Sequence, residues 1–399
     1  MKVILIYIFT LLIGLGNIFG QEYSLYSNDK LSIESEYLQE TIDLNLHLPE
    51  TQAFSANTTK YPITIIFDSQ HERTYPLIIN SIDLLTSETQ IPESIIIGVP
   101  FNFQNRLYLT SSQKRGNDSL SGIERMELFL FNELIPQLQN KYKGNGYISF
   151  IGHSRTAFLV NYLAFKRPDQ INLAVSLSGF FNDAPLSLNT FHNFLADGSN
   201  FPYKFSYYYT AGTSLEESTY LVQYRNLDSL MRKKSISENV KVLFSITPNA
   251  NHITNYWVSL PPILIDAFSS YNSILDSWFH DESKAESIDN PLQQFEMDLE
   301  QAGKSIGVNL NPNLTHIFSL ASHYANKEDY LTAIKFFELG LDYFPEYLEL
   351  YVEIIELYKV LHNTEKISSY KGVLREKSMN SLYLTEAEKQ EVIEYLDKK

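Results

Sequence analysis

The 399 residues of this chain are 44% hydrophobic and 14% aromatic, which is enough to fill two or three domain cores and excludes a disordered protein. The net charge of −16 repels nucleic acids and anionic lipids, so we expect neither as a partner. There is no cysteine, which excludes disulfide bonds and a lipidated N-terminal cysteine.

The first twenty residues have the pattern of a secretory signal peptide. Lys2 gives the positive start, residues 3–15 are mostly apolar, and Gly20 precedes Gln21 at a suitable cleavage point. The apolar run is shorter than the roughly 20 residues of a spanning helix, although an N-terminal membrane anchor is the alternative. We therefore expect an exported protein, periplasmic or secreted, that does not associate with the membrane once residues 1–20 are removed.

Alternating strand and helix patterns predict the fold of residues 22–281. Segments 30–38 and 41–49 alternate apolar and polar residues, which predicts two antiparallel strands at a sheet edge. Nearly continuous apolar runs at 63–67, 94–99, 147–151, 173–177 and 240–245 predict strands buried under helices. An aromatic run at 205–209 predicts a further strand of this kind. Helical spacing follows at 123–142, 221–231 and 263–279. The succession predicts an α/β fold with a mostly parallel sheet.

The pattern becomes helical after a polar segment. Residues 282–290 have no apolar period and predict a linker, and Pro291 can then begin a new helix. Residues 291–399 show helical patterns throughout, and 314–347 fit the offsets of a tetratricopeptide repeat, with an ordinary helical hairpin as the alternative. One such repeat cannot bury its own faces, so we expect it to pack on the first domain or to bind a protein partner.

A serine lies between a predicted strand and a predicted helix. Residues 152–156 read Gly-His-Ser-Arg-Thr and follow the apolar run 147–151. A serine on a sharp turn between a strand and a helix is how α/β-hydrolases expose a nucleophile, so Ser154 is the candidate. Thr156 replaces the last glycine of the G-x-S-x-G pattern, and a β-branched residue fits a crowded turn less well than glycine.

A nucleophilic serine needs a base and an acid that orients the base. In α/β-hydrolases the acid and then the histidine follow the serine, each on a loop after a strand. His252 follows the last apolar strand and is the candidate base. After the aromatic strand we expect Glu216 to be the acid, with Glu217 as the alternative and Asp183 as a more distant candidate.

The oxyanion of the reaction needs two backbone N–H donors. One should come from Arg155, directly after the nucleophile, and the other from Gln70, in the loop after Asp68. The Arg155 side chain would either place a positive charge near the substrate or lie solvated at the surface. Metal-ligand spacing and phosphate-binding glycine loops are missing from the sequence, so we predict neither a metal nor a cofactor.

Six segments carry a family resemblance: 32–38, 46–49, 66–70, 131–136, 152–154 and 251–252. Together they resemble the putative esterase family of α/β-hydrolases, which includes esterase D-like enzymes, siderophore esterases, feruloyl esterases and mycolyltransferases. The resemblance covers roughly residues 28–280. It implies cofactor-free hydrolysis of carboxylic esters through an acyl-enzyme.

Carried over by position, the resemblance implies roles for Ser154, His252 and the amides of Gln70 and Arg155. Where the family reads G-H-S-x-G-G, this chain has Thr156 and then alanine. It keeps the family's Asn-Arg pair at 105–106 but lacks the acid that often follows.

The sequence therefore predicts an exported serine esterase with a Ser-His-Glu triad and a small-molecule ester substrate. The alternative is a catalytically weak α/β-hydrolase domain that serves as a scaffold or binding module, with the helical repeat as its partner site. An acyltransferase with the same triad is a further alternative. We also expect a chain truncated near residue 283 to keep activity on a small ester.

Overall fold

The computed structural model describes residues 26–182, 184–201, 203–233, 236–280 and 288–397. The predicted signal peptide, the candidate Asp183 and most of the predicted linker lie outside these residues. Within them, no helix combines the length and the apolar character that a membrane crossing requires.

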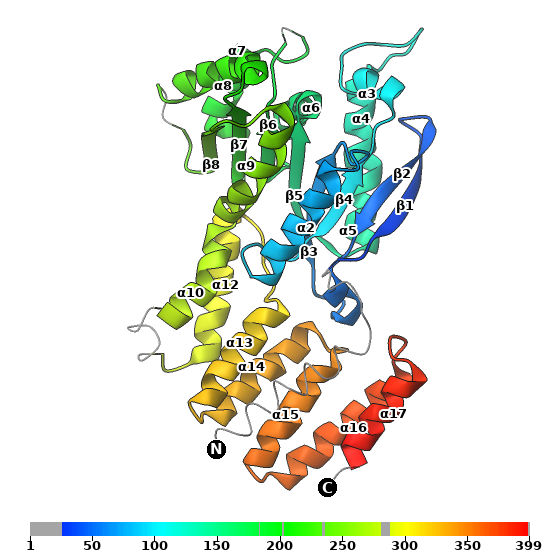
Figure 1. Cartoon of the computed structure of the whole chain (residues 1–399), viewed down its shortest axis with the longest axis vertical. Coiled ribbons are helices and arrows are strands. Elements are labelled where there is room, and N and C mark those ends of the chain that lie inside the picture. Colours follow the sequence, from blue (N-terminus) through cyan, green and yellow to red (C-terminus); the bar gives the residue numbers. More distant parts are fainter. Residues whose placement is uncertain (1–25, 183, 202, 234–235, 281–287, 398–399) are drawn as a thin grey trace.

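An eight-stranded sheet forms the centre of the first domain (Figure 1). Its order is β1-β2-β4-β3-β5-β6-β7-β8, and β2 alone runs against the other strands. The predicted antiparallel pair and the mostly parallel sheet are confirmed. The strands are β1 (Asp29–Ser35), β2 (Glu40–His47), β3 (Tyr61–Phe67), β4 (Ile95–Val99), β5 (Gly144–His153), β6 (Leu173–Leu177), β7 (Phe205–Gly212) and β8 (Val240–Thr247).

The position of each strand in the sheet explains its burial. Every residue of β3 and β4 is buried, because these strands have neighbours on both sides and helices on both faces. The prediction of a buried strand at 240–245 is wrong in one respect. β8 is an edge strand with a single neighbour, β7, and Leu243 and Ile246 remain partly exposed.

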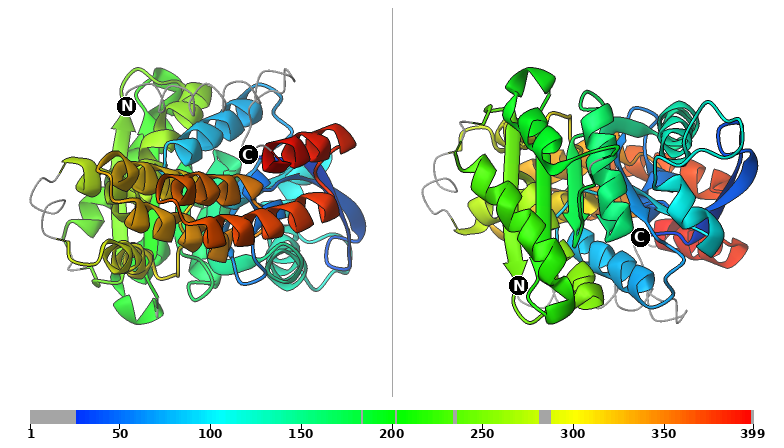
Figure 2. Two further views of the ribbon diagram at one scale, coloured as in Figure 1. Left: turned by 90° about the horizontal axis from the view of Figure 1, so that it is seen from below. Right: turned by 90° about the horizontal axis from the view of Figure 1, so that it is seen from above.

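Helices cover both faces of the sheet (Figures 1 and 2). One apolar cluster lies under α4, a π-helical turn, α5, α6, α7 and α8, and a second lies under α2 and α9. The predicted helix at 263–279 is two helices that break at Phe268, and the first begins earlier, at His252. The bounds are α2 (Thr74–Ser87), α3 (Phe103–Leu109), α4 (Gly122–Leu128), the π-helical turn (Phe129–Leu134), α5 (Ile135–Lys141), α6 (Arg155–Lys166), α7 (Leu188–Ala196), α8 (Ser218–Met231), α9 (His252–Ala267) and α10 (Ser269–His280).

The described residues after Asn290 form helices joined by short turns. As predicted, Pro291 begins a helix, and Asn290 caps it by accepting the Gln293 N–H. The pair at 314–347 is observed as a helical hairpin, and its identification as a tetratricopeptide repeat stays a prediction. The helices are α12 (Pro291–Ile306), α13 (Leu314–Asn326), α14 (Tyr330–Tyr343), α15 (Leu348–Val360), α16 (Thr364–Asn380) and α17 (Glu386–Asp397).

The C-terminal helices pack on the first domain. The second apolar cluster continues from the sheet through α9 and α10 into α12, α13 and α14. Trp278 of α10 is buried, contacts the ring of Phe336 at a centroid distance of 6.4 Å, and donates Nε1–H to Asp298 at 2.9 Å. The Ala56 N–H also donates to the Tyr343 carbonyl at 2.8 Å. Of the two expectations for the helical region, packing on the first domain is the one that the structure shows.

This contact lies at the amino ends of the parallel strands. Asn311 donates to the carbonyl of Lys60, directly before β3, and Asn145 at the start of β5 donates to the carbonyl of Asn309. Figure 2, seen from below, shows α13 to α17 crossing this end of the domain. The loops that follow the strands, where Ser154 and His252 lie, are at the opposite end.

We predict that truncation after His280 produces an aggregating protein, which revises the expectation from the sequence. The cut would expose the apolar face of α10, on which Tyr271, Ile274 and Trp278 are buried. Size-exclusion chromatography and thermal unfolding of the truncated chain measure this. Truncation after Asn380 removes only α17 and should leave a soluble protein. A monomer of residues 21–280 that unfolds cooperatively would contradict the prediction.

Candidate active site

Ser154 stands on a strained turn between β5 and α6. Its φ of 59° and ψ of −117° are rare for a residue with a side chain. The Ser154 N–H donates to the carbonyl of Leu177 on β6 at 2.8 Å, which fixes the turn to the neighbouring strand. Gly152 provides the space, because a Cβ there would lie 2.3 Å from the carbonyl oxygen of Thr156. The strand, turn and helix predicted around Ser154 are all present.

Thr156 is accommodated because its hydroxyl has partners. The side chain is buried, and Oγ1 lies 2.9 Å from both the Asp68 carboxylate and the His153 carbonyl, either of which can accept its hydrogen. Oγ1 also accepts the His153 N–H at 3.0 Å. Glycine could make none of these side-chain contacts. Thr156, which replaces the glycine of the sequence pattern, therefore connects the serine turn to Asp68 without distorting the turn.

Asp68 holds together the loop that contains Gln70. Arg106 of α3 donates to both carboxylate oxygens, with distances of 2.7 Å from Nε and 2.6 Å from Nη2, and Gln70 Nε2 donates at 3.0 Å. The side chain is buried, which by itself would raise its pKa. The hydrogen bonds and charge of Arg106, with the bonds of Gln70 and Thr156, outweigh burial and lower the pKa of Asp68. Asp68 is therefore ionised and fixes the loop beside the serine.

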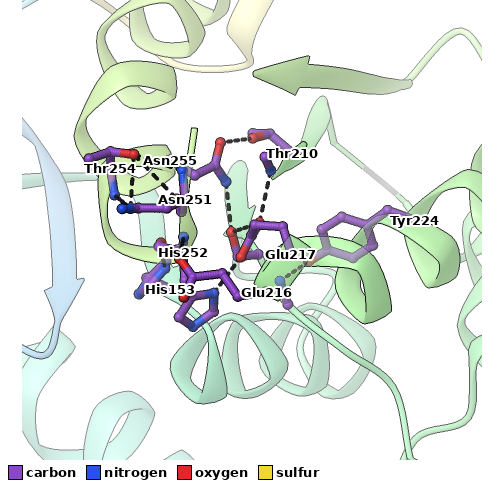
Figure 3. Close-up of polar contacts among 12 residues, drawn as sticks. His153, Thr210, Glu216, Glu217, Tyr224, Asn251, His252, Thr254 and Asn255 are labelled. Carbon is purple, nitrogen blue, oxygen red and sulfur yellow. Dashed lines mark hydrogen bonds and ion pairs between the residues drawn. The ribbon is translucent and has the colours of Figure 1, made fainter. Parts of the chain in front are cut away.

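Glu217, and not Glu216, contacts the imidazole of His252 (Figure 3). A 3₁₀ turn (Leu215–Glu217) follows β7 and directs Glu217 inward, with 0% of its surface exposed, and Glu216 outward. Oε1 of Glu217 lies 2.5 Å from Nδ1 of His252. Glu216 accepts the backbone N–H of His252 at 2.9 Å and so holds the main chain. The expectation that Glu216 orients the ring is corrected in favour of its neighbour.

The buried charge of Glu217 is balanced by donors. Its Oε2 accepts from the Ser178 hydroxyl at 2.6 Å and from the Gly212 N–H at 2.8 Å, and Ser178 accepts from Asn255 at 2.7 Å. Burial acts to raise the pKa of Glu217, but the bonds from His252, Ser178 and Gly212 outweigh it and lower the pKa. An ionised Glu217 places the imidazole hydrogen on Nδ1 and leaves Nε2 of His252 as the basic nitrogen.

The position of His252 is fixed at both its ring and its backbone. It is the first residue of α9, after Asn251, whose side chain accepts the Thr254 N–H at 2.8 Å. The ring stacks on Tyr220 at 4.7 Å between centroids, and the carbonyl accepts from Nε2 of His153 at 2.6 Å. Burial is the larger cause and electrostatic repulsion from His252 the smaller one, and together they lower the pKa of His153 to about 4. His153 therefore stays neutral near pH 7. His153, the residue directly before the serine, is therefore hydrogen-bonded to the backbone of the candidate base.

An open cleft of about 800 Å³ brings the predicted residues together at the carboxyl end of the sheet. Ser154, His252, Gln70 and Arg155 all line it. Arg155 is the first residue of α6, where a helix N–H has no carbonyl of its own helix to bond. The other lining residues are His71, Phe101, Phe103, Gln104, Arg106, Leu107, His153 and Ile253. Across the described ranges, no group of three or more His, Asp or Glu side chains has a metal-binding arrangement.

Three supporting residues of the site were not found from the sequence. Ser178 binds Glu217 and Asn255 binds Ser178 across long separations in the chain, and no short motif contains them. The sequence marks Asp68 only as the residue before the loop that contains Gln70. The signal that could have found it is its position at the carboxyl end of a central strand, next to Gln70.

The sheet order and the strained serine define the class of this protein as an α/β-hydrolase, with a carboxylate and a histidine after the last two strands. The sequence matches the family described as Putative esterase over residues 35–259, more than half of its length, and the chain belongs to that family. Family membership supports hydrolysis of small-molecule esters. A comparison with curated proteins gives no match.

Several solved structures share the fold at low sequence identity. A protein from Capnocytophaga ochracea, described as uncharacterised, has a TM-score of 0.58 at 18% identity, over 93% of this chain and 99% of that one. An IroE-like serine hydrolase from Shewanella oneidensis has a TM-score of 0.61 at 17% identity, over 78% and 98%. The BES protein from Bacillus cereus has 0.52 at 16%, over 62% and 98%. The coverage of the first takes in most of the helical region as well.

We predict that Thr156→Val lowers the free energy of unfolding by about 1–3 kcal/mol, because the buried His153 N–H loses its acceptor and Asp68 loses a donor. Thr156→Ser keeps the hydroxyl and should retain most of the stability. Urea unfolding of the two variants measures the difference. Equal stabilities would show that the hydroxyl is not what this position requires.

We predict that Glu217→Gln lowers kcat on a p-nitrophenyl ester by about 10²- to 10⁴-fold. The Gly212 N–H can only meet the amide oxygen, so the amide NH₂ would face Nδ1 of His252 and favour the tautomer with its hydrogen on Nε2. Glu216→Gln keeps an oxygen for the His252 N–H and is the matched control, with little expected loss. Circular dichroism verifies folding. A loss confined to Glu216→Gln would return the role of acid to Glu216.

Proposed function

We propose that this protein is an exported serine esterase that hydrolyses carboxylic esters through an acyl-enzyme. The observation that carries the proposal is the hydrogen bond between buried Glu217 and His252, beside a cleft that His252 shares with Ser154. Membership of the esterase family supports the reaction class. Export rests on the signal-peptide pattern of residues 1–20.

In the first half of the reaction, the Ser154 hydroxyl attacks the ester carbonyl while Nε2 of His252 takes its proton. Glu217 stabilises the imidazolium that forms. The amides of Arg155 and Gln70 donate to the oxyanion of the tetrahedral intermediate. The carbon–oxygen bond to the alcohol then breaks, and His252 returns the proton to the leaving oxygen.

In the second half, water attacks the acyl-enzyme. His252 takes a proton from the water, the bond between the acyl carbon and the Ser154 oxygen breaks, and the proton returns to that oxygen. The carboxylic acid leaves and the free serine is restored. An alcohol that replaces water in this step would give acyl transfer through the same residues, and the products formed with added alcohol distinguish the two reactions.

We predict that a fluorophosphonate probe labels the wild-type protein and does not label Ser154→Ala, because only an activated serine attacks phosphorus at a useful rate. His252→Ala should label much more slowly. Ser229→Ala, on the exposed side of α8, is the matched control and should label like the wild type. Labelling is read by gel fluorescence and the site by mass spectrometry. Failure of the wild type to label would favour the scaffold alternative.

A further inference from the structure

The charges of the cleft differ from those of the whole protein. The chain has a net charge of −16, yet the described residues that line the cleft include two arginines, Arg106 and Arg155, and no carboxylate. Glu217 lies behind His252 and has no exposed surface. A substrate that enters the cleft therefore meets cationic side chains within a protein whose overall charge is strongly negative.

The two arginines are not equivalent. Arg106 is neutralised by its two bonds to Asp68. Arg155 forms an ion pair with no residue that the structure describes. Its guanidinium lies 5.6 Å from the ring centroid of Phe180, which stacks on Phe158 at 5.3 Å, so an aromatic platform holds the charge at the cleft.

The surroundings of Arg155 favour an anion. The side chain is half-buried, and both burial and the nearby charge of Arg106 lower its pKa. A half-buried guanidinium without a counter-ion has lost part of its hydration, and a carboxylate that accepts its hydrogen bonds would restore the balance. The position of Arg155, directly after Ser154, puts such an anion a few atoms from the ester carbonyl.

Another part of the cleft is apolar and open. Phe103 is 97% exposed, Leu107 49% and Ile253 53%, and all three line the cleft. Side chains of this kind at the rim of a pocket offer a surface for hydrocarbon. The cleft thus combines an unpaired cation with an apolar wall.

We propose that the cleft selects esters that carry a carboxylate a few carbons from the ester bond, with the carboxylate bound by the Arg155 guanidinium and the hydrocarbon part against Phe103, Leu107 and Ile253. The selection rests on the proposed esterase function. Arg155 has two separate contributions in this scheme. Its backbone N–H serves the oxyanion of any ester, whereas its side chain acts only on a charged substrate.

Two matched pairs of esters test the selection. The acyl side is tested with 4-nitrophenyl hydrogen glutarate against 4-nitrophenyl valerate, and the alcohol side with 4-carboxyphenyl butyrate against phenyl butyrate. In Arg155→Gln, the ratio of kcat/KM for the charged ester to that for the neutral ester should fall by about 10- to 100-fold in at least one pair. The change should lie mainly in the KM of the charged ester, and added salt should reduce the preference of the wild type.

Two control variants separate a local charge effect from a change of net charge. Arg155→Lys keeps the positive charge and should keep most of the preference. Arg225→Gln, on the exposed surface of α8, changes the net charge equally and should leave the ratio unchanged.

A second readout does not require that the enzyme turn over an ester. Monomethyl glutarate should slow fluorophosphonate labelling more than methyl valerate does, and Arg155→Gln should abolish that difference.

Each contrary result has a defined meaning. An unchanged ratio in both ester pairs for Arg155→Gln overturns the proposal. If the charged and neutral esters lose activity equally, the ratio is unchanged and the side chain acts on the transition state or on folding. If no test ester is hydrolysed, the labelling experiment decides. The proposal is then overturned if monomethyl glutarate and methyl valerate slow fluorophosphonate labelling equally. By contrast, a wild type that neither hydrolyses any ester nor reacts with fluorophosphonate refutes the esterase function itself.

Discussion

The carboxylate of Glu217 is a buried charge, and it is stable only while donors surround it. Those donors lie at the carboxyl ends of three neighbouring strands: Ser178 directly after β6, Gly212 as the last residue of β7 and His252 in the segment after β8. One anion therefore holds three strand ends at fixed distances from one another. The same bonds keep the carboxylate ionised, and an ionised carboxylate sets the tautomer of the imidazole. The local stability of the site and its capacity for proton transfer therefore depend on one set of hydrogen bonds.

Backbone strain gathers at the same edge of the sheet. Asp68, Ser154 and Ser178 each directly follow a strand, and each has a positive φ, of 63°, 59° and 48°. Such conformations cost about 1–3 kcal/mol each and persist where the surroundings hold them. The N–H of Ser154 bonds to β6 and that of Ser178 to β7, while the Asp68 side chain is held by Arg106. The sharp turns bring side chains from three adjacent strands toward one place, which ordinary loop conformations would not do.

The residues that the sequence predicted and those it missed differ in the range of the interactions that place them. Ser154 and His252 are marked by local patterns, an apolar strand followed by a turn and a helix, so the sequence predicts both as candidates, and the structure places them in the same cleft. The choice between Glu216 and Glu217 depends on the phase of a three-residue turn, and three residues have no apolar period from which that phase could be read. Thr156 looked like a defect because its partner Asp68 is 88 residues away. The apolar strand β8 looked central because residue types do not show how many neighbours a strand has.

The helical region and the cleft lie at opposite ends of the sheet, yet one helix connects them. α9 begins at His252 and, at about 1.5 Å per residue, extends about 24 Å toward the amino ends of the strands. There the chain breaks at Phe268 and continues as α10, whose Tyr271 and Trp278 are buried against α13 and α14. Pro261 and Pro262 lie inside α9 and lack N–H groups, so they interrupt the hydrogen bonds along its axis. The packing of α10 therefore fixes the C-terminal end of α9. No described residue of the helical region lines the cleft, but these helices anchor the far end of the helix that begins at His252, the candidate base. This gives the C-terminal helices a structural reason to accompany the esterase domain, independent of any partner that they bind.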